Sequence, residues 1–309
     1  MRMNKIFDLI IIGAGPAGIT ASVYAARQRL NFLVITKDIG GQAALSGDVE
    51  NYTGYQFISG PKLAAKFEEH MRKFDFELKE GEESRDIKEK AGVFEVTTGK
   101  GAYQARAVII ASGKKSRELN VPGEKEFKNK GITYCATCDG PLFSGKDVAV
   151  IGGGNSALDA AIQLLKIARK VYVINTGPQL GGDMIAQEQV YGSKVATVLN
   201  NSRVTAVSGE KMVNGIKIKR DGKEEILPVQ GVFVEIGLIP NTDFSGDVEK
   251  NVLGEIKVDC RNETNIPGIF AAGDATDVPE KQIIIAAGEG AKAALSAFKY
   301  LARQSKKAV

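Results

Sequence analysis

Residues 8–36 have the sequence DLIIIGAGPAGITASVYAARQRLNFLVIT, and this stretch decides the fold. The apolar run at residues 8–12 predicts a buried strand, which ends in a glycine-rich turn at residues 13–18. Small residues at 19–29 then predict a helix, and residues 32–35 predict a second strand. This arrangement is typical of a dinucleotide-binding βαβ unit, because the helix N-terminus offers free N–H groups and a positive dipole end to a pyrophosphate.

A second copy of the pattern occurs at residues 147–175, which have the sequence DVAVIGGGNSALDAAIQLLKIARKVYVIN. Gly13 and Thr36 are 23 positions apart, and so are Gly152 and Asn175, which indicates an internal repeat. A hairpin is expected after each copy, at 94–98 with 103–111 and at 216–220 with 225–236. A single glycine turn can be free of ligand, but two in matching contexts predict two dinucleotide sites.

The rest of the chain predicts one discontinuous domain with a second domain inserted into it. A strand at 269–274 and an amphipathic helix at 282–301 follow the second copy, and they are too short to form a third domain. We therefore expect an α/β fold of two Rossmann-like, doubly wound, three-layer nucleotide-binding domains. The first comprises residues 1–113 and 244–309, and the second comprises residues 114–243. Two connections would let the domains rotate as rigid bodies.

Composition and charge narrow the classes of function. The 309 residues carry a formal net charge of +4, from 41 basic and 37 acidic side chains spread along the chain, which argues against a nucleic-acid partner. No apolar stretch approaches the roughly 20 residues of a membrane span, and the N-terminus lacks the features of a signal peptide. Three cysteines and one histidine supply neither a disulfide framework nor an ordinary zinc site. We expect a cytoplasmic protein without a membrane partner or a bound metal.

Cys135 and Cys138, followed by Asp139, are the candidate redox centre. Two thiols separated by two residues can close and reopen a disulfide, so the pair can store two electrons. In a reducing compartment such a pair is more often catalytic than structural. The competing interpretations are half of a metal site for the cysteines and a turn residue before Gly140 and Pro141 for Asp139.

These motifs together resemble the thioredoxin reductase family over nearly the whole chain. The segments that carry the resemblance are GAGPAG at 13–18, GGQ at 40–42, EN at 50–51, CATCDG at 135–140, GGGNSA at 152–157 and GD at 273–274. Stretches at 131–134, 140–143 and 281–285 are closer to the C-terminal part of the alkyl hydroperoxide reductase flavoprotein. That flavoprotein has an additional N-terminal redox module, and we expect this chain to lack it.

The resemblance implies FAD in the discontinuous domain, a nicotinamide dinucleotide in the inserted domain, and a homodimer. The residues that it places at FAD are Gly13, Gly15, Pro16, Ala17, Thr36, Gly41, Gln42, Asn51, Ala111, Gly113, Gly273, Asp274, Gln282 and Ile283. Those that it places at the nicotinamide dinucleotide are Gly152, Gly154, Asn155, Ser156, Asn175, Ile236 and Gly237.

The resemblance also assigns roles at the cysteine pair. Cys138 would be the sulfur next to the flavin, Cys135 would attack the partner's disulfide, and Asp139 would handle the proton during exchange. The partner implied is a thioredoxin-like or glutaredoxin-like protein. The chain would thus act as a thioredoxin-disulfide reductase-like FAD oxidoreductase.

The electron donor is the least determined feature. NADPH-using relatives carry arginines after the second strand of the inserted domain, where this chain has Asn175, Thr176 and Gly177. The absence of arginine favours NADH, with Asn175 accepting hydrogen bonds from the ribose hydroxyls. A ferredoxin or another reduced flavin stays open as the donor. A flavin-based redox sensor and a flavin oxidase also stay open, although the intact cysteine pair with its aspartate counts against both.

Overall fold

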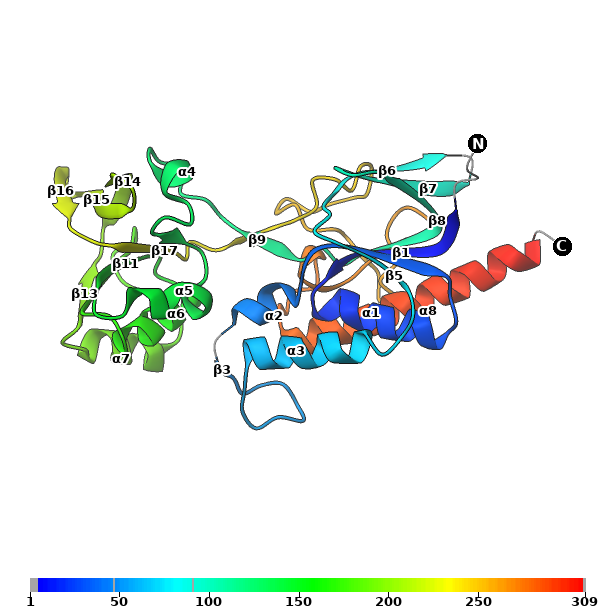
Figure 1. The fold of residues 1–309 in the computed structure, drawn as a ribbon, viewed down its shortest axis with the longest axis horizontal. Coiled ribbons are helices and arrows are strands. Elements are labelled where there is room, and N and C mark those ends of the chain that lie inside the picture. Colours follow the sequence, from blue (N-terminus) through cyan, green and yellow to red (C-terminus); the bar gives the residue numbers. More distant parts are fainter. Residues whose placement is uncertain (1–4, 47, 91, 308–309) are drawn as a thin grey trace. The chain divides into compact units, whose positions relative to one another are not determined.

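The computed structural model describes residues 5–46, 48–90 and 92–307 (Figure 1). The chain forms two compact units, the first from Met1–Lys115 with Ile239–Val309 and the second from Ser116–Leu238. The chain crosses between the units in β9 (Lys114–Ser116) and β18 (Leu238–Pro240), which pair as a two-stranded sheet.

The first unit is built on a sheet in the order β5-β2-β1-β8-β7-β6, with β19 also paired to β8. Its parallel strands are β1 (Ile6–Ala14), β2 (Phe32–Ile39), β5 (Glu77–Glu80), β8 (Ala102–Ile110) and β19 (Ile269–Ala271). The antiparallel strands β6 (Ser84–Lys90) and β7 (Val93–Thr98) extend it beyond β8. A short pair, β3 (Asp48–Val49) with β4 (Ile58–Ser59), lies outside this sheet.

Both faces of β1 are buried, which explains its continuous apolar sequence. Leu9 and Ile11 pack with the helical alanines of one core, whereas Ile10 and Ile12 pack with Phe244 in another. The helices α1 (Pro16–Arg27), α3 (Gly60–Met71) and α8 (Ile283–Lys307) lie together on one side of the sheet (Figure 1). The remaining helical turns are α2 (Gly41–Leu45) and η2 (Gly273–Ala275).

The second unit contains a parallel sheet in the order β10-β17-β11-β12-β13 and an antiparallel sheet in the order β14-β15-β16. The parallel strands are β10 (Ile132–Thr133), β11 (Asp147–Ile151), β12 (Lys170–Ile174), β13 (Ala196–Leu199) and β17 (Gly231–Val234). The antiparallel strands are β14 (Ser202–Gly209), β15 (Val213–Arg220) and β16 (Lys223–Leu227). The helices are α4 (Glu124–Phe127), α5 (Ala136–Asp139), η1 (Gly140–Phe143), α6 (Asn155–Leu165) and α7 (Met184–Gly192).

The predicted α/β class with two parallel nucleotide-binding sheets is confirmed. One element was predicted wrongly, because the strand expected at 225–236 is two strands, β16 and β17, in different sheets. Pro228 follows the end of β16, and proline has no N–H to donate to a strand ladder. The corresponding β8 of the first unit has no proline and continues unbroken from its pairing with β7 into its pairing with β1.

No helix in the part of the chain that the structure describes is long and apolar enough to cross a bilayer.

The contact between α1 and α8 yields a test of the fold. A Cβ added to Gly290 would lie 2.0 Å from the carbonyl oxygen of Ala17, whereas one added to Gly288 of the same helix would meet nothing within 4 Å. We expect Gly288→Ala to raise the free energy of unfolding by about 0.5–1 kcal/mol through helix propensity. Gly290→Ala should lower it by about 1–3 kcal/mol, because the helices must separate. Urea unfolding of both variants measures this, and equal effects at both positions would contradict the packing described.

Candidate functional site

The glycine turn of the first unit is held by close backbone contacts. Gly13 has a φ of +101°, and a Cβ at this position would lie 2.3 Å from the carbonyl oxygen of Ala111. A Cβ at Gly18 would lie 1.9 Å from the carbonyl oxygen of Gly13. The hydroxyl oxygen of Thr36 accepts a hydrogen bond from the backbone N–H of Ala14 at 3.1 Å. The turn therefore packs directly against the ends of β2 and β8.

The N-terminus of α1 is left open by this turn. Gly15 is its N-cap residue and supplies no side-chain cap, Pro16 opens the helix, and the first turn contains no acidic residue. A Cβ at Gly15 would meet only the Cα of Gly41, at 3.9 Å. The first N–H groups of a helix lack internal partners, so this end can bind an anion that approaches close to the backbone.

Asp274 is a partly exposed carboxylate beside this turn. The described part of the chain gives its side chain no hydrogen-bond donor. Burial raises the pKa of Asp274, and the positive charges of Lys281 and Lys114 act in the opposite direction. Both lysines pair instead with the buried Glu255, at 3.2 and 3.0 Å. Asp274 can therefore still accept hydrogen bonds from a ligand's hydroxyl groups.

Of the other predicted FAD residues of the first unit, some contact the glycine turn and others contact one another or neighbouring loops. Gly273 stands next to Ala17, because a Cβ on it would lie 3.0 Å from the Ala17 side chain. Asn51 donates to the Gln282 side chain at 3.0 Å, just before α8 begins at Ile283. The remaining contacts are Gln42 donating to the Lys114 carbonyl at 3.3 Å and Gly113 accepting from the Asn241 N–H at 2.9 Å.

The glycine turn of the second unit repeats the geometry of the first. A Cβ at Gly152 would lie 2.1 Å from the carbonyl oxygen of Glu235, whereas a Cβ at Gly154 would meet nothing within 4 Å. Gly154 is the N-cap residue of α6, supplies no side-chain cap, and no acidic residue occupies the first turn. Ser156 is exposed in that turn, and the Asn155 side chain accepts from the Asp183 N–H at 2.8 Å. Ile236 and Gly237 follow the neighbouring strand β17.

Asn175 is buried, and its carboxamide is already hydrogen-bonded within the protein. Its Nδ2 donates to the Gln179 carbonyl at 2.7 Å and to the Asn200 side chain at 3.0 Å, and its Oδ1 accepts from the Gly177 N–H at 3.2 Å. The side chain holds the turn after β12 in this structure. The ribose contact expected of Asn175 stays a prediction, and it would use the second lone pair of Oδ1, since among the described residues only the Gly177 N–H donates to this oxygen.

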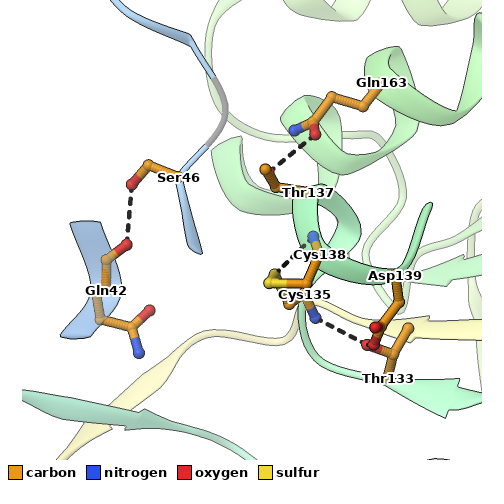
Figure 2. Close-up of a disulfide and its surroundings, with 8 residues drawn as sticks. All are labelled: Gln42, Ser46, Thr133, Cys135, Thr137, Cys138, Asp139 and Gln163. Carbon is orange, nitrogen blue, oxygen red and sulfur yellow. Dashed lines mark hydrogen bonds between the residues drawn. A yellow bond between two sulfur atoms is a disulfide. The ribbon is translucent and has the colours of Figure 1, made fainter. Parts of the chain in front are cut away.

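Cys135 and Cys138 form a disulfide, as the sequence predicted (Figure 2). The Cys135 sulfur caps the short helix α5, accepting from the Cys138 N–H at 3.0 Å. Cys138 is exposed and Cys135 is half-buried. The buried Thr133 hydroxyl donates to the Asp139 carboxylate and accepts from the Cys135 N–H at 3.2 Å. The structure thus brings together the three residues predicted to be catalytic.

A buried carboxylate that supports this loop was not predicted from the sequence. Glu124 accepts hydrogen bonds from the N–H groups of Leu119 and Asn120 at 2.7 and 2.6 Å and from the Tyr134 hydroxyl at 2.7 Å. Burial, together with this hydrogen bond, raises the pKa of Tyr134. The only sequence signal is a glutamate directly after Gly123 at a helix start, which is common in exposed positions as well.

Glu235 is a second acidic group that sequence analysis missed, next to the glycine turn of the second unit. Burial raises its pKa to about 8, and the negative charge of Asp159 on α6 acts in the same direction. The pKa of Asp159 is raised as well, by burial and by Asp183. Glu235 therefore stays protonated over most of the neutral range.

The family follows from comparison with known proteins. The profile of the pyridine nucleotide-disulphide oxidoreductases matches residues 7–291. The chain belongs to the pyridine nucleotide-disulphide oxidoreductase family. The predicted resemblance to the thioredoxin reductase family is confirmed. The family binds FAD and a pyridine nucleotide.

Three relatives illustrate the match. The chain is 45% identical over 301 residues to an NADH dehydrogenase of Bacillus subtilis, covering 96% of this chain and 59% of that protein. It is 42% identical over 312 residues to one subunit of the alkyl hydroperoxide reductase of Escherichia coli, covering 98% and 60%. It superposes on thioredoxin reductase of Lactococcus lactis with a TM-score of 0.88 and 32% identity, covering 96% and 99%. The chain therefore spans about 60% of the two curated relatives.

The pKa of Glu235 leads to a stability prediction. The unfolded chain releases this proton near pH 4.5, whereas the folded chain keeps it until about pH 8. The free energy of unfolding should therefore fall as pH rises through this window. Glu235→Gln removes the charge, so it should be more stable than the wild type by on the order of 2 kcal/mol at about pH 9 and show a much smaller difference at about pH 5.

Urea unfolding at the two pH values measures this difference. Glu225→Gln is the matched control, because it removes the same charge from an exposed side chain of the same unit. A Glu235→Gln variant whose advantage is equal at both pH values would contradict the buried, protonated glutamic acid.

Proposed function

We propose that this chain is an FAD-dependent disulfide reductase. In this proposal electrons pass from a nicotinamide dinucleotide through FAD to the Cys135–Cys138 disulfide, and then to a disulfide of a thioredoxin-like or glutaredoxin-like protein. The observation that carries the proposal is the Cys135–Cys138 disulfide itself. It lies next to the Asp139 carboxylate, which accepts a hydrogen bond from the Thr133 hydroxyl. The match to thioredoxin reductase structures supports the choice of partner class.

The first unit has the groups that FAD requires. The open N-terminus of α1 fits the pyrophosphate. The Asp274 carboxylate, which receives no hydrogen bond from the described residues, fits the ribityl hydroxyls. Gln282 and Ile283, at the start of α8, would meet the pyrimidine edge of the flavin, where helix N–H groups stabilise negative charge. FAD, when bound, would transfer an electron pair from the nicotinamide to the disulfide.

The second unit would hold the nicotinamide dinucleotide at the open N-terminus of α6. We propose NADH as the preferred donor, because residues 175–179 contain no arginine to bind a 2′-phosphate. The Bacillus subtilis relative, an NADH dehydrogenase, supports this choice. The internal hydrogen bonds of Asn175 favour the alternative, in which a ferredoxin or another reduced flavin supplies the electrons.

The exchange chemistry follows from the three residues at the disulfide. After reduction, the Cys135 thiolate attacks the partner's disulfide, so that a mixed disulfide forms and one partner sulfur leaves. Asp139, which takes up a proton from solvent in the reduced protein, gives that proton to the leaving sulfur. The Cys138 thiolate then attacks the Cys135 sulfur, closing the Cys135–Cys138 disulfide and releasing the partner with both sulfurs reduced. Two electrons leave the cysteine pair and two enter the partner.

The assembly proposed is a cytoplasmic homodimer, on the grounds of the family resemblance.

Anaerobic titration of the FAD-loaded protein with NADH, and separately with NADPH, tests which electron donor reduces the flavin. We expect NADH to bleach the flavin at lower concentration than NADPH. A flavin that dithionite bleaches but neither nucleotide does would overturn the nicotinamide assignment and support the alternative donor.

Serine variants of the two cysteines test the transfer of electrons to the partner's disulfide. Cys138→Ser leaves Cys135 without its resolving thiol, so it should accumulate a mixed disulfide with an oxidised thioredoxin, detected by mass spectrometry. Cys135→Ser should accumulate none. Cys138 is the more exposed of the two residues in this structure. The opposite result would reverse the roles of the two cysteines.

Asp274 should control FAD affinity. Removing a hydrogen-bonding charged group costs about 1.5–3 kcal/mol, so Asp274→Ala should weaken FAD binding by roughly 10- to 100-fold. Glu280→Ala, which removes an exposed carboxylate from the same segment, is the control. Fluorescence titration of the apoprotein measures both, and equal affinity of the two variants would contradict the ribityl contact.

A further inference from the structure

The Thr133 hydroxyl occupies the junction between the cysteine loop and Asp139 (Figure 2). Thr133 is the last residue of β10, and it pairs with Phe233 of the fully buried strand β17. Thr133 is buried and its backbone is held by the parallel sheet, so the point from which its side chain extends is fixed. The hydroxyl is therefore a rigid point next to a carboxylate on the cysteine loop.

The hydrogen-bonding capacity of the Thr133 hydroxyl explains how it can bind Asp139 and Cys135 at the same time. A threonine hydroxyl has one hydrogen to donate and two lone pairs to accept with. Its hydrogen is donated to Oδ2 of Asp139, and one lone pair accepts the N–H of Cys135 at 3.2 Å. Within the described residues no other side chain hydrogen-bonds the Asp139 carboxylate. Thr133 is thus the group that orients it relative to the backbone of Cys135.

We propose that Thr133 is a positioning residue for the proton transfer made by Asp139. The inference rests on the proposed disulfide reductase function. By holding Oδ2, the hydroxyl fixes both torsions of the Asp139 side chain and leaves Oδ1 available to the leaving sulfur. A carboxyl group that transfers a proton must lie within hydrogen-bonding reach of the acceptor, so a fixed orientation raises the fraction of productive encounters.

The proton balance at this site is simple. In the reduced protein Asp139 first takes up a proton from solvent. Its O–H bond then breaks as an S–H bond forms on the partner's leaving sulfur, which leaves Asp139 as a carboxylate again. Thr133 keeps its own hydrogen throughout and donates it to that carboxylate. Hydrogen bonds to an ionised acceptor are stronger than those between neutral groups, so the contact strengthens as the proton leaves.

The neighbouring Thr137 supplies a matched control. Its hydroxyl belongs to the same loop, between the two cysteines, but it donates to Gln163 of α6 at 3.0 Å (Figure 2). Thr133→Val and Thr137→Val each exchange one hydroxyl for a methyl group of similar volume. Only the first removes a contact to Asp139.

The test is a double-mutant cycle between Thr133→Val and Asp139→Asn, measured as steady-state reduction of an oxidised thioredoxin by the FAD-loaded full chain. Thr133→Val should lower kcat about tenfold or more with little change in KM, and Thr133→Ser should restore most of it. In the Asp139→Asn background, Thr133→Val should change kcat less than about twofold, because the group it orients no longer transfers a proton. Thr137→Val should have the same proportional effect in both backgrounds.

Several outcomes overturn the inference. One is a Thr133→Val effect of equal proportion in both backgrounds, and another is a Thr133→Ser variant as slow as Thr133→Val. Thermal unfolding and flavin absorbance show whether each variant is folded and loaded with FAD. Thr133→Ala, which also removes the hydroxyl, takes the place of Thr133→Val in the cycle if the valine variant does not fold. A wild-type chain that reduces no disulfide protein overturns the proposed function together with this inference. A wild-type chain that turns over no faster than Thr133→Val overturns the inference alone.

Discussion

The rest of the first unit depends on one constraint. At the first glycine turn, the backbone is packed so closely at Gly13 and Gly18 that neither position has room for a side chain. The backbone of Gly13 presses against the carbonyl of Ala111, and that of Gly18 presses against Gly13 itself. With the strand end and the helix start so close, α1 leaves its first N–H groups facing outward without a cap. The same closeness extends to α8, where Gly290 contacts the backbone of Ala17. The same close backbone contacts therefore serve two purposes. They leave a turn that suits a pyrophosphate, and they let the helices pack compactly.

The glycine turn of the second unit is packed as closely as that of the first, and it also lies next to a carboxyl group that is difficult to ionise. Its Gly152 packs against the backbone of Glu235, whose side chain is largely removed from water beside Asp159. Burial raises the pKa of Glu235, and the neighbouring negative charge of Asp159 raises it further. The turn that would receive an anionic dinucleotide consequently has less negative charge near neutral pH than its sequence suggests.

The redox loop is supported differently, by hydroxyl and carboxylate groups and not by glycines. Thr133 orients Asp139, and Glu124 holds Tyr134 against the segment that enters the second unit. Both supports come from buried side chains with almost complete hydrogen bonding, which limits the positions the loop can take. These buried supports keep the disulfide and its proton donor in a fixed relative orientation, while the cysteines stay at least partly exposed.

The sequence by itself determined the two βαβ units, their glycine turns and the cysteine pair, because each of these depends on local spacing and on residue types with few substitutes. It did not determine where the strand expected at 225–236 breaks, because a single proline could equally have ended the strand or stood at an edge. Only the tertiary structure showed that Asn175 faces inward, that burial raises the pKa of Glu235 and that Thr133 meets Asp139. Those properties arise from segments distant in the chain or from side-chain direction, and neither is encoded in a local pattern.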